Sequence, residues 1–294
     1  MGGTWLAAVA TAVLFCVAPL TAAGEVSGQF RVADRTIAPT HAAAYTVRDP
    51  RDPRRLATEV VLSEGPVDVD AAIAALSPHQ HVINQPGIGN YVMLWVRPDR
   101  EVSMNATFAA TMTQYLDVTG SGGPFGGHLT AELQATGAER VSGRVYAPQP
   151  VQTMGGESYE VDLRFSSAVA RSTPGAELGP RGGEPGRSFA ALYTALGRKN
   201  WPAVRSRLSH GAVATLEQSY RSAEENRDYV FDLLEHWLPK KKMKVTAGEL
   251  RGHTATLDVE GESAAGLRAL YLVRMIEEAG SWRFEQATMA GLLR

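Results

Sequence analysis

The chain has 294 residues, a formal net charge of -2, a hydrophobic content of 44% and a charged content of 20%. These proportions are typical of globular proteins, and they exclude a disordered polyelectrolyte and a strongly basic nucleic-acid-binding surface. The only cysteine, Cys16, lies within residues 1–23, so residues 24–294 cannot supply a disulfide, a cysteine metal site or a thiol nucleophile. The length is sufficient for two domains, and all lysines lie after residue 184, which makes the two halves different in composition.

Residues 1–23 carry no charged side chain and are predicted to be a signal peptide. The apolar run Leu6–Ala18 ends in a helix-breaking proline, and small residues follow up to Ala23, after which we expect cleavage. The bulky Phe15 directly before Cys16 argues against lipoprotein processing. An uncleaved membrane anchor is the alternative, although the run is shorter than the roughly 20 residues that cross a bilayer. Cleavage predicts a periplasmic or secreted protein that keeps no membrane span.

Residues 24–171 are predicted to form an antiparallel β-sandwich domain. Short runs alternate apolar and polar residues with a period of two, which is typical of strands that bury one face, and Val92–Val96 is the clearest example. Turn sequences such as Gln85–Gly87 separate these runs. Asp70–Leu76 fits a helix of one or two turns. A β-barrel is the alternative arrangement of the same strands.

Residues 172–186 are predicted to be a linker with a solvated, mobile backbone, because glycine and proline dominate them and no apolar period continues there. Residues 187–238 change to a helical period, and the first apolar stripe is Phe189, Leu192, Tyr193 and Leu196.

Pro239 ends the last of the predicted helices, and the period of two then returns for four strands, of which the final one contains Trp282 and Phe284. Helices followed by antiparallel strands predict an α+β domain over residues 187–294. Its helices must cover one face of the sheet, because a helix and a sheet each have one apolar face to bury.

The segment Ser188–Leu196, the turn Lys199–Val204 that leads into Arg207–Ser209, and the final strand Trp282–Phe284 resemble bacterial nuclear transport factor 2-like domains. The resemblance covers residues 187–294 and depends on the order of the elements rather than on an invariant motif. It implies a curved antiparallel sheet wrapped around a long helix, which together form a cone with an internal pocket. Family members include isomerases, dehydratases, small-ligand binders and assembly modules, so the resemblance implies a fold and no single function. The N-terminal β domain resembles no family in this way.

Enzymatic members of that family use an acid or base that faces the cone, typically Asp or His with Tyr partners. The polar residues expected near the interior here are Tyr193, Tyr220, Tyr229, His236 and Tyr271. A buried tyrosine can donate a hydrogen bond to a ligand, and a histidine can move a proton near neutral pH. The alternative is that the rings of Tyr193 and Tyr271 fill space on apolar stripes. We therefore predict these five as ligand-binding residues and assign no catalytic residue.

The pattern His79-Gln80-His81 would direct two imidazoles to one side if it lay on a strand. A metal site needs a third or fourth ligand, which His41 or His128 could supply only through the fold. Two surface histidines are the favoured interpretation, and we predict no metal site.

Two further segments suggest binding without establishing it. The glycine-rich Gly120–Gly127 does not lie between a strand and a helix, as a phosphate-binding loop does, so we predict a flexible hairpin loop and no cofactor. The basic run Lys240–Lys244 could contact anionic lipid. A solvated loop that complements the preceding helix dipole is the favoured interpretation.

Two classes of function are compatible with these features. The favoured hypothesis is a non-catalytic binding or interaction module of the bacterial cell envelope, because the sequence contains no GxSxG, HExxH or nucleotide-binding motif. Its expected partner is a small apolar ligand or an envelope protein, and not a nucleic acid. The alternative is a small-molecule carrier, or an enzyme of the isomerase or dehydratase type, that uses the cone pocket. That alternative requires an open cone, and filling by Phe, Leu and Trp would argue against it.

Overall fold

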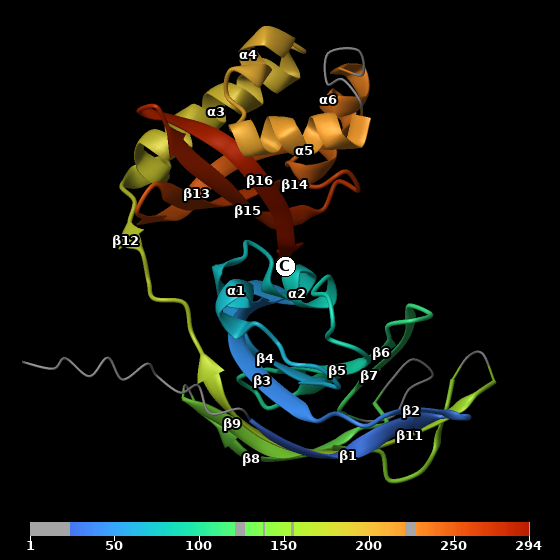
Figure 1. Cartoon of the computed structure of the whole chain (residues 1–294). Coiled ribbons are helices and arrows are strands. Elements are labelled where there is room, and N and C mark those ends of the chain that lie inside the picture. The colour runs from blue at the N-terminus through green and yellow to red at the C-terminus, as the bar shows by residue number, and fades with distance from the viewer. Residues whose placement is uncertain (1–23, 121–126, 138, 154–155, 221–226, 294) are drawn as a thin grey trace, which may run out of the picture.

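The computed structural model describes residues 24–120, 127–137, 139–153, 156–220 and 227–293. The predicted signal peptide, residues 1–23, lies outside the described residues, and so does most of the glycine-rich loop at residues 120–127. The described part of the chain is rich in β-strands, which form two separate sheets (Figure 1). We refer to residues 24–171 as the N-terminal unit and to residues 172–293 as the C-terminal unit.

The sheet of the N-terminal unit has eleven strands in the order β2-β1-β11-β3-β4-β5-β6-β7, with β9 and β10 also paired to β11, and β8 paired to β9. The strands are β1 (Glu25–Val32), β2 (Arg35–Ile37), β3 (His41–Asp49), β4 (Asp52–Ser63), β5 (Tyr91–Val96), β6 (Val102–Phe108), β7 (Thr113–Val118), β8 (Thr130–Thr136), β9 (Arg140–Tyr146), β10 (Val151–Gln152) and β11 (Ser158–Ala170). The pairing of β11 with β3 is parallel, whereas the other pairs of named strands in this sheet are antiparallel.

This sheet is curled, and its two halves enclose one apolar core. Strands β3–β7 form one half, and β1, β2 and β8–β11 form the other (Figure 1). The rings of Phe30 and Tyr159 stack at 5.3 Å between their centroids, and Tyr115 of the opposite half packs at 5.6 Å from Phe30. A bridge between Thr119 and Leu129 joins the end of β7 to the segment before β8. The architecture therefore lies between the predicted sandwich and its barrel alternative.

The continuity of the sheet depends on β11, which was not foreseen. This strand pairs with β1, β3, β9 and β10 along its 13 residues, and it passes from one half of the sheet to the other. Alternating burial along a strand reveals which side chains face the core, but it does not reveal which strands are neighbours.

Two short helices, α1 (Val69–Ala74) and α2 (Pro78–Ile83), cover the outer face of β3–β5. Helix α1 overlaps the predicted helical turn Asp70–Leu76, although it begins one residue earlier and ends two residues earlier, and the side chain of Asp68 caps its first turn. Ala72 and Val82 pack on this face of the sheet. Strand β5 is consequently buried on both faces, which explains its nearly continuous apolar sequence.

The C-terminal unit consists of a five-stranded antiparallel sheet in chain order with helices on one face. The elements are β12 (Ala176–Glu177), a 3₁₀ turn (Pro180–Gly182), α3 (Gly183–Gly197), α4 (Trp201–Arg205), α5 (His210–Tyr220), α6 (Arg227–Trp237), β13 (Lys241–Arg251), β14 (Thr254–Glu262), β15 (Arg268–Glu278) and β16 (Ser281–Leu292). In Figure 1 the sheet lies between helices α3–α6 and the N-terminal unit.

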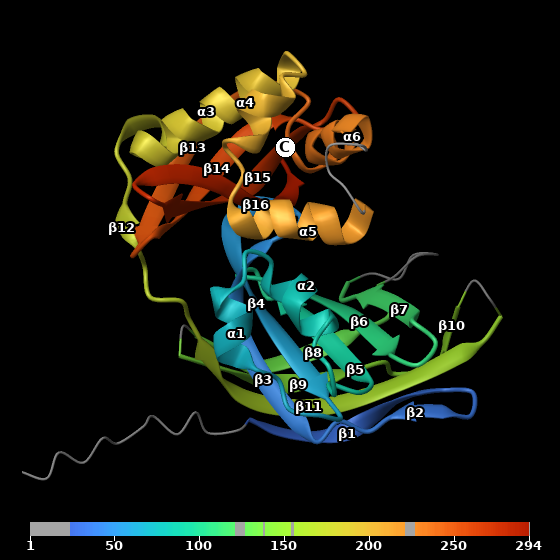
Figure 2. The same ribbon diagram turned by 45° about the horizontal axis from the view of Figure 1, so that its top comes forward.

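The predicted linker, residues 172–186, is more regular than expected. Ala176–Glu177 pairs with β13, and α3 already begins at Gly183. A Cβ atom on Gly186 would lie 1.9 Å from the carbonyl oxygen of Arg181. Close packing therefore explains this glycine, which we had interpreted as a sign of mobility. The chain crosses from one unit to the other along one side of the molecule, between β11 and β12 (Figure 2).

The basic run Lys240–Lys244 also differs from the prediction of a solvated loop. Its last four residues lie in β13, where Lys241 pairs with Glu262 and Lys244 pairs with Glu260 across the strands. The acidic partners on β14 favour the strand, because opposite charges across a sheet stabilise the pairing.

The two units contact each other through charged side chains. Nη2 of Arg48, on β3, donates to both carboxylate oxygens of Asp258 on β14 at 2.8 Å. Nη2 of Arg54 donates to Oε1 of Glu260 at 2.7 Å, and this contact lowers the pKa of that carboxyl. The face of the second sheet that lacks helices is thus turned toward β3 and β4.

Candidate functional site

A cleft of about 850 Å³ lies between the two units. Its N-terminal wall is formed by the ends of β3, β4, β5 and β8 together with the end of α1, and its C-terminal wall is formed by β13, β14 and β15. Residues 171, 172 and 174, on the crossing segment, also line it. We call this space the cleft. Its volume is within the usual range of small-molecule sites.

The C-terminal wall follows from the period of two in its strands. Ala255, Leu257 and Val259 point toward the helices and belong to the apolar core. Thr254 and Thr256 alternate with them and line the cleft. Thr256 is the cross-strand partner of Arg274 on β15 and of Glu249 on β13, so these three side chains lie in one row.

Arginine is the main charged residue of the cleft. The lining contains Arg48, Arg97, Arg171, Arg251 and Arg274, and Glu249 is its only acidic member among the described residues. Arg48 pairs with Asp258, and Arg251 pairs with Glu249 at 2.8 Å.

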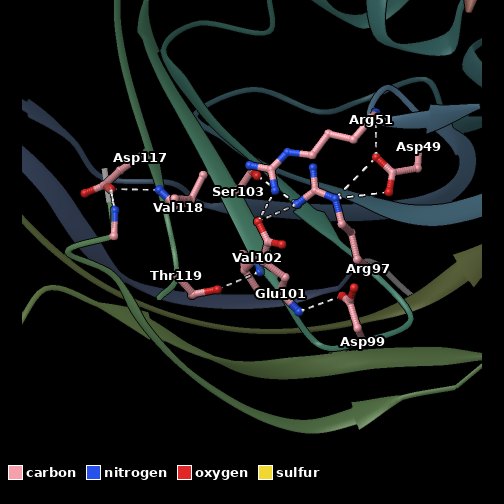
Figure 3. Close-up of polar contacts among 11 residues, drawn as sticks. Asp49, Arg51, Arg97, Asp99, Glu101, Val102, Ser103, Asp117, Val118 and Thr119 are labelled. Atoms are coloured by element: carbon pink, nitrogen blue, oxygen red, sulfur yellow. Dashed lines mark hydrogen bonds and ion pairs between the residues drawn. The ribbon is translucent and has the colours of Figure 1, made fainter. Parts of the chain in front are cut away.

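Arg97 belongs to a buried polar network at the end of β5 (Figure 3). Its Nε lies 3.1 Å from Oδ2 of Asp49, and the two side chains are only 7% and 5% exposed. Nη1 of Arg97 donates to Oγ of Ser103 at 2.9 Å, and Arg51 forms an ion pair with Glu101 beside it. A fully satisfied network of this kind fixes the turns around it, and we assign Arg97 a structural role at the margin of the cleft.

Arg171 and Arg274 differ from the other three arginines. Nη2 of Arg274 donates to the carbonyl oxygen of Ala74, at the end of α1, at 2.7 Å. Its Nε is buried and has no acceptor among the described residues. Arg171 is exposed, and its guanidinium forms no ion pair with the part of the chain that the structure describes. The cleft therefore contains two cations that no carboxylate of the described residues neutralises.

Of the five residues predicted from the sequence, Tyr193 and Tyr271 lie near each other. The hydroxyl of Tyr193 donates to the carbonyl oxygen of Pro239 at 3.0 Å. Burial raises the pKa of Tyr271, and the neighbouring Tyr193 raises it further. Burial likewise raises the pKa of Tyr193. None of these contacts involves the cleft.

The other three predicted residues do not join that pair. Tyr229 and His236 lie on exposed positions of α6, and the side chain of Tyr220, at the end of α5, lies outside the described residues. The space between the helices and the sheet is occupied by large apolar side chains. Phe189, Leu192, Trp201, Phe231 and Phe284 are all less than 10% exposed there.

The two histidines of the HxH pattern lie on helix α2, where we had considered a strand. Residues two apart on a helix point in different directions, so His79 and His81 cannot face one ligand. Nδ1 of His79 lies 3.4 Å from Oε1 of Glu59 instead. No group of three or more His, Cys, Asp or Glu side chains that could hold a metal occurs within the described ranges.

Glu59 is a buried acid that sequence reasoning missed. It is 0% exposed on β4, and Oε1 accepts a hydrogen bond from the hydroxyl of Tyr45 at 2.6 Å. Burial and the adjacent carboxylate raise the pKa of Tyr45. The only sequence signal is a glutamate within the apolar run of β4, which is buried on both faces. This cluster lies beneath α2 and does not line the cleft.

No family model matches the chain, and a search of the curated proteins gives no match. Of the helices within the described residues, none combines the length and the apolar character that crossing a bilayer requires.

Proposed function

We propose that this protein is an exported, two-domain bacterial protein of the cell envelope that binds a ligand without chemical conversion, and that the ligand occupies the cleft. The observation that carries the proposal is the cleft itself, which is built from both units and has a volume of about 850 Å³. Export is supported by the composition of residues 1–23.

The residue types of the cleft favour binding over catalysis. Arginine, threonine and serine side chains supply hydrogen bonds and positive charge. Glu249, the acid of the described lining, is held by Arg251 and also accepts a hydrogen bond from the backbone N–H of Gly175 at 3.2 Å. A general base should instead have an unoccupied oxygen within reach of a substrate proton.

We further propose that the C-terminal domain is nuclear transport factor 2-like and that the N-terminal domain is a variant of a β-sandwich. The helices α3–α6, packed on one face of the antiparallel strands β13–β16, support the first assignment. The apolar core between the two halves of the curled sheet supports the second. Because large apolar side chains occupy the helix-covered side of the second sheet, we favour a supporting role for that interior over an enzyme or carrier pocket.

Native mass spectrometry of the protein purified from its own envelope tests the proposal. We expect the chain to retain a small ligand. Thr256→Phe, which fills the cleft from the sheet, should release the bound mass. Thr36→Phe places the same ring on an exposed strand position outside the cleft and should retain it. A wild-type chain that carries no bound mass, or a ligand that Thr256→Phe retains, would contradict the proposal.

A further inference from the structure

We infer that the cleft is specific for an organic anion, a molecule that joins a carboxylate or phosphate group to an apolar part. This inference rests on the proposed function and names its ligand class. Three features of the cleft carry it: an excess of cations, hydroxyl groups on both walls, and exposed apolar surface beside them.

The cation excess remains after the internal ion pairs are counted. Asp258, Asp49 and Glu249 neutralise Arg48, Arg97 and Arg251 in that order. Arg171 and Arg274 have no such partner among the described residues, so the cleft keeps a net positive charge. Two guanidinium groups in a concave space between protein walls attract anions strongly, because the walls exclude water that would screen the charge.

Arg274 has more donor groups than its surroundings satisfy. Nη2 is used by Ala74 and the buried Nε has no acceptor, while Nη1 forms no hydrogen bond with the described residues. Buried donors are normally paired, and a charged donor that lacks a partner marks a place where an acceptor is expected. A carboxylate or phosphate oxygen in the cleft would accept from Nη1, which is not used by the described residues, whereas the buried Nε stays covered by protein.

Hydroxyl groups and apolar side chains complete the cleft. Thr46 and Thr58 line the N-terminal wall opposite Thr254 and Thr256, and a threonine hydroxyl can donate to an anion. Leu56 also lines the cleft, although its side chain is 58% exposed. A ligand with an apolar part would cover this leucine, which a purely ionic ligand would leave in water.

Isothermal titration calorimetry with four simple probes tests the inference. The probes are octyl phosphate, octanoate, inorganic phosphate and octyltrimethylammonium, with the octyl compounds kept below their micellar concentrations. We expect the two octyl anions to bind the wild-type protein, with inorganic phosphate weaker and the octyl cation without measurable binding. Comparison of octyl phosphate with octanoate distinguishes a phosphate from a carboxylate ligand.

Two substitutions locate the binding. Arg171→Gln and Arg274→Gln should each weaken binding of the octyl anions about tenfold, which is the usual loss for one hydrogen bond to a charged group. Arg198→Gln removes an exposed arginine at the end of α3 and should leave the affinity unchanged. Because Arg274 also contacts α1, Arg171→Gln decides the question if Arg274→Gln fails to fold.

The outcomes separate the inference from the proposed function. If neither octyl anion binds in the millimolar range, or if both bind Arg171→Gln as tightly as the wild type, the inference is wrong. If the octyl cation binds as tightly as the anions and Thr256→Phe abolishes it, the anion preference is wrong while a binding role for the cleft stands.

Discussion

The two faces of the C-terminal sheet differ in composition and surroundings although they are formed by the same strands. On one face Leu257, Val273 and Phe284 are 0% exposed and pack against the helices. On the other face Thr256 and Arg274 stand in one cross-strand row beside the cleft. Because side chains alternate along a strand, the sheet buries one apolar face against the helices and leaves a polar face beside the cleft.

The largest effect should come from the helix-covered face. Phe284→Ala should destabilise the C-terminal unit by about 3–5 kcal/mol, because it removes a fully buried ring and leaves a cavity. Thr256→Ala, on the cleft face of β14, is the matched change and should cost less than about 1 kcal/mol. Urea denaturation followed by circular dichroism measures both. Equal losses for the two variants would mean that the two faces do not differ in their contribution to stability.

Contacts between the units should contribute less. Arg48→Gln breaks the two hydrogen bonds to Asp258, whose carboxylate is 19% exposed, and should cost about 1 kcal/mol. Asp258→Asn should cost a similar amount, and the double variant should lose less than the sum of the two, because the residues act as a pair. Strict additivity in the double-mutant cycle would show that this ion pair does not couple the units.

The buried Tyr271, on the helix-covered face, should make the stability of the protein depend on pH. Burial raises the pKa of its hydroxyl in the folded state, so the folded chain holds that proton more tightly than the unfolded chain. The protonated hydroxyl therefore contributes its full share to the free energy of unfolding below about pH 10, the pKa of an unfolded tyrosine. That contribution is lost as the pH rises from there through the higher pKa of the folded state.

Tyr271→Phe should therefore change stability little at neutral pH and should reduce the loss of stability above about pH 10. Thermal unfolding measured between neutral and alkaline pH gives the comparison. Tyr229→Phe, at a position that is 53% exposed, is the control. If the melting temperatures of the wild type and of Tyr271→Phe fell in parallel as the pH rose, burial would not affect the pKa of the Tyr271 hydroxyl.

The sequence predicted the helices and strands of the C-terminal unit, but it did not predict which of their residues line the cleft. The helical stripe through Phe189 and the strand alternation through Leu257 both correspond to buried positions, because amphipathic periods report burial directly. The residues of the cleft were not predicted. Arg171, the last residue of the predicted sandwich domain, and Arg274, on a strand of the second domain, are 103 positions apart in the sequence, and both line the cleft only because the chain crosses between the units. No local sequence pattern predicts that residues so far apart in the chain line the same cleft.

The lack of long-range information in a local pattern also explains why the ligand-binding residues predicted from the sequence do not line the cleft. Tyr193 and Tyr271 were selected as polar residues expected near the interior of the second domain. Tyr271 belongs to the packed core, Tyr193 is half-buried and donates to the carbonyl oxygen of Pro239, and neither lines the cleft. Glu59 was overlooked because a strand buried on both faces hides a buried carboxylate among apolar neighbours. Thr256 and Arg274 instead occupy the polar positions of alternating strands, and the sequence alone does not distinguish such positions from those exposed to solvent.

The smallest effect on stability should come from Leu56, and it gives the sharpest test of the cleft face. Leu56→Ala should change the free energy of unfolding by less than about 0.5 kcal/mol, because the side chain is 58% exposed. The affinity for octyl phosphate should nevertheless fall several-fold, since the apolar part of the probe loses its contact, while the affinity for inorganic phosphate should not change. Leu116→Ala, at an exposed position of β7 outside the cleft, should alter neither affinity. If Leu56→Ala weakened both probes equally, the apolar part of the ligand would not lie against β4, and the cleft would recognise charge alone.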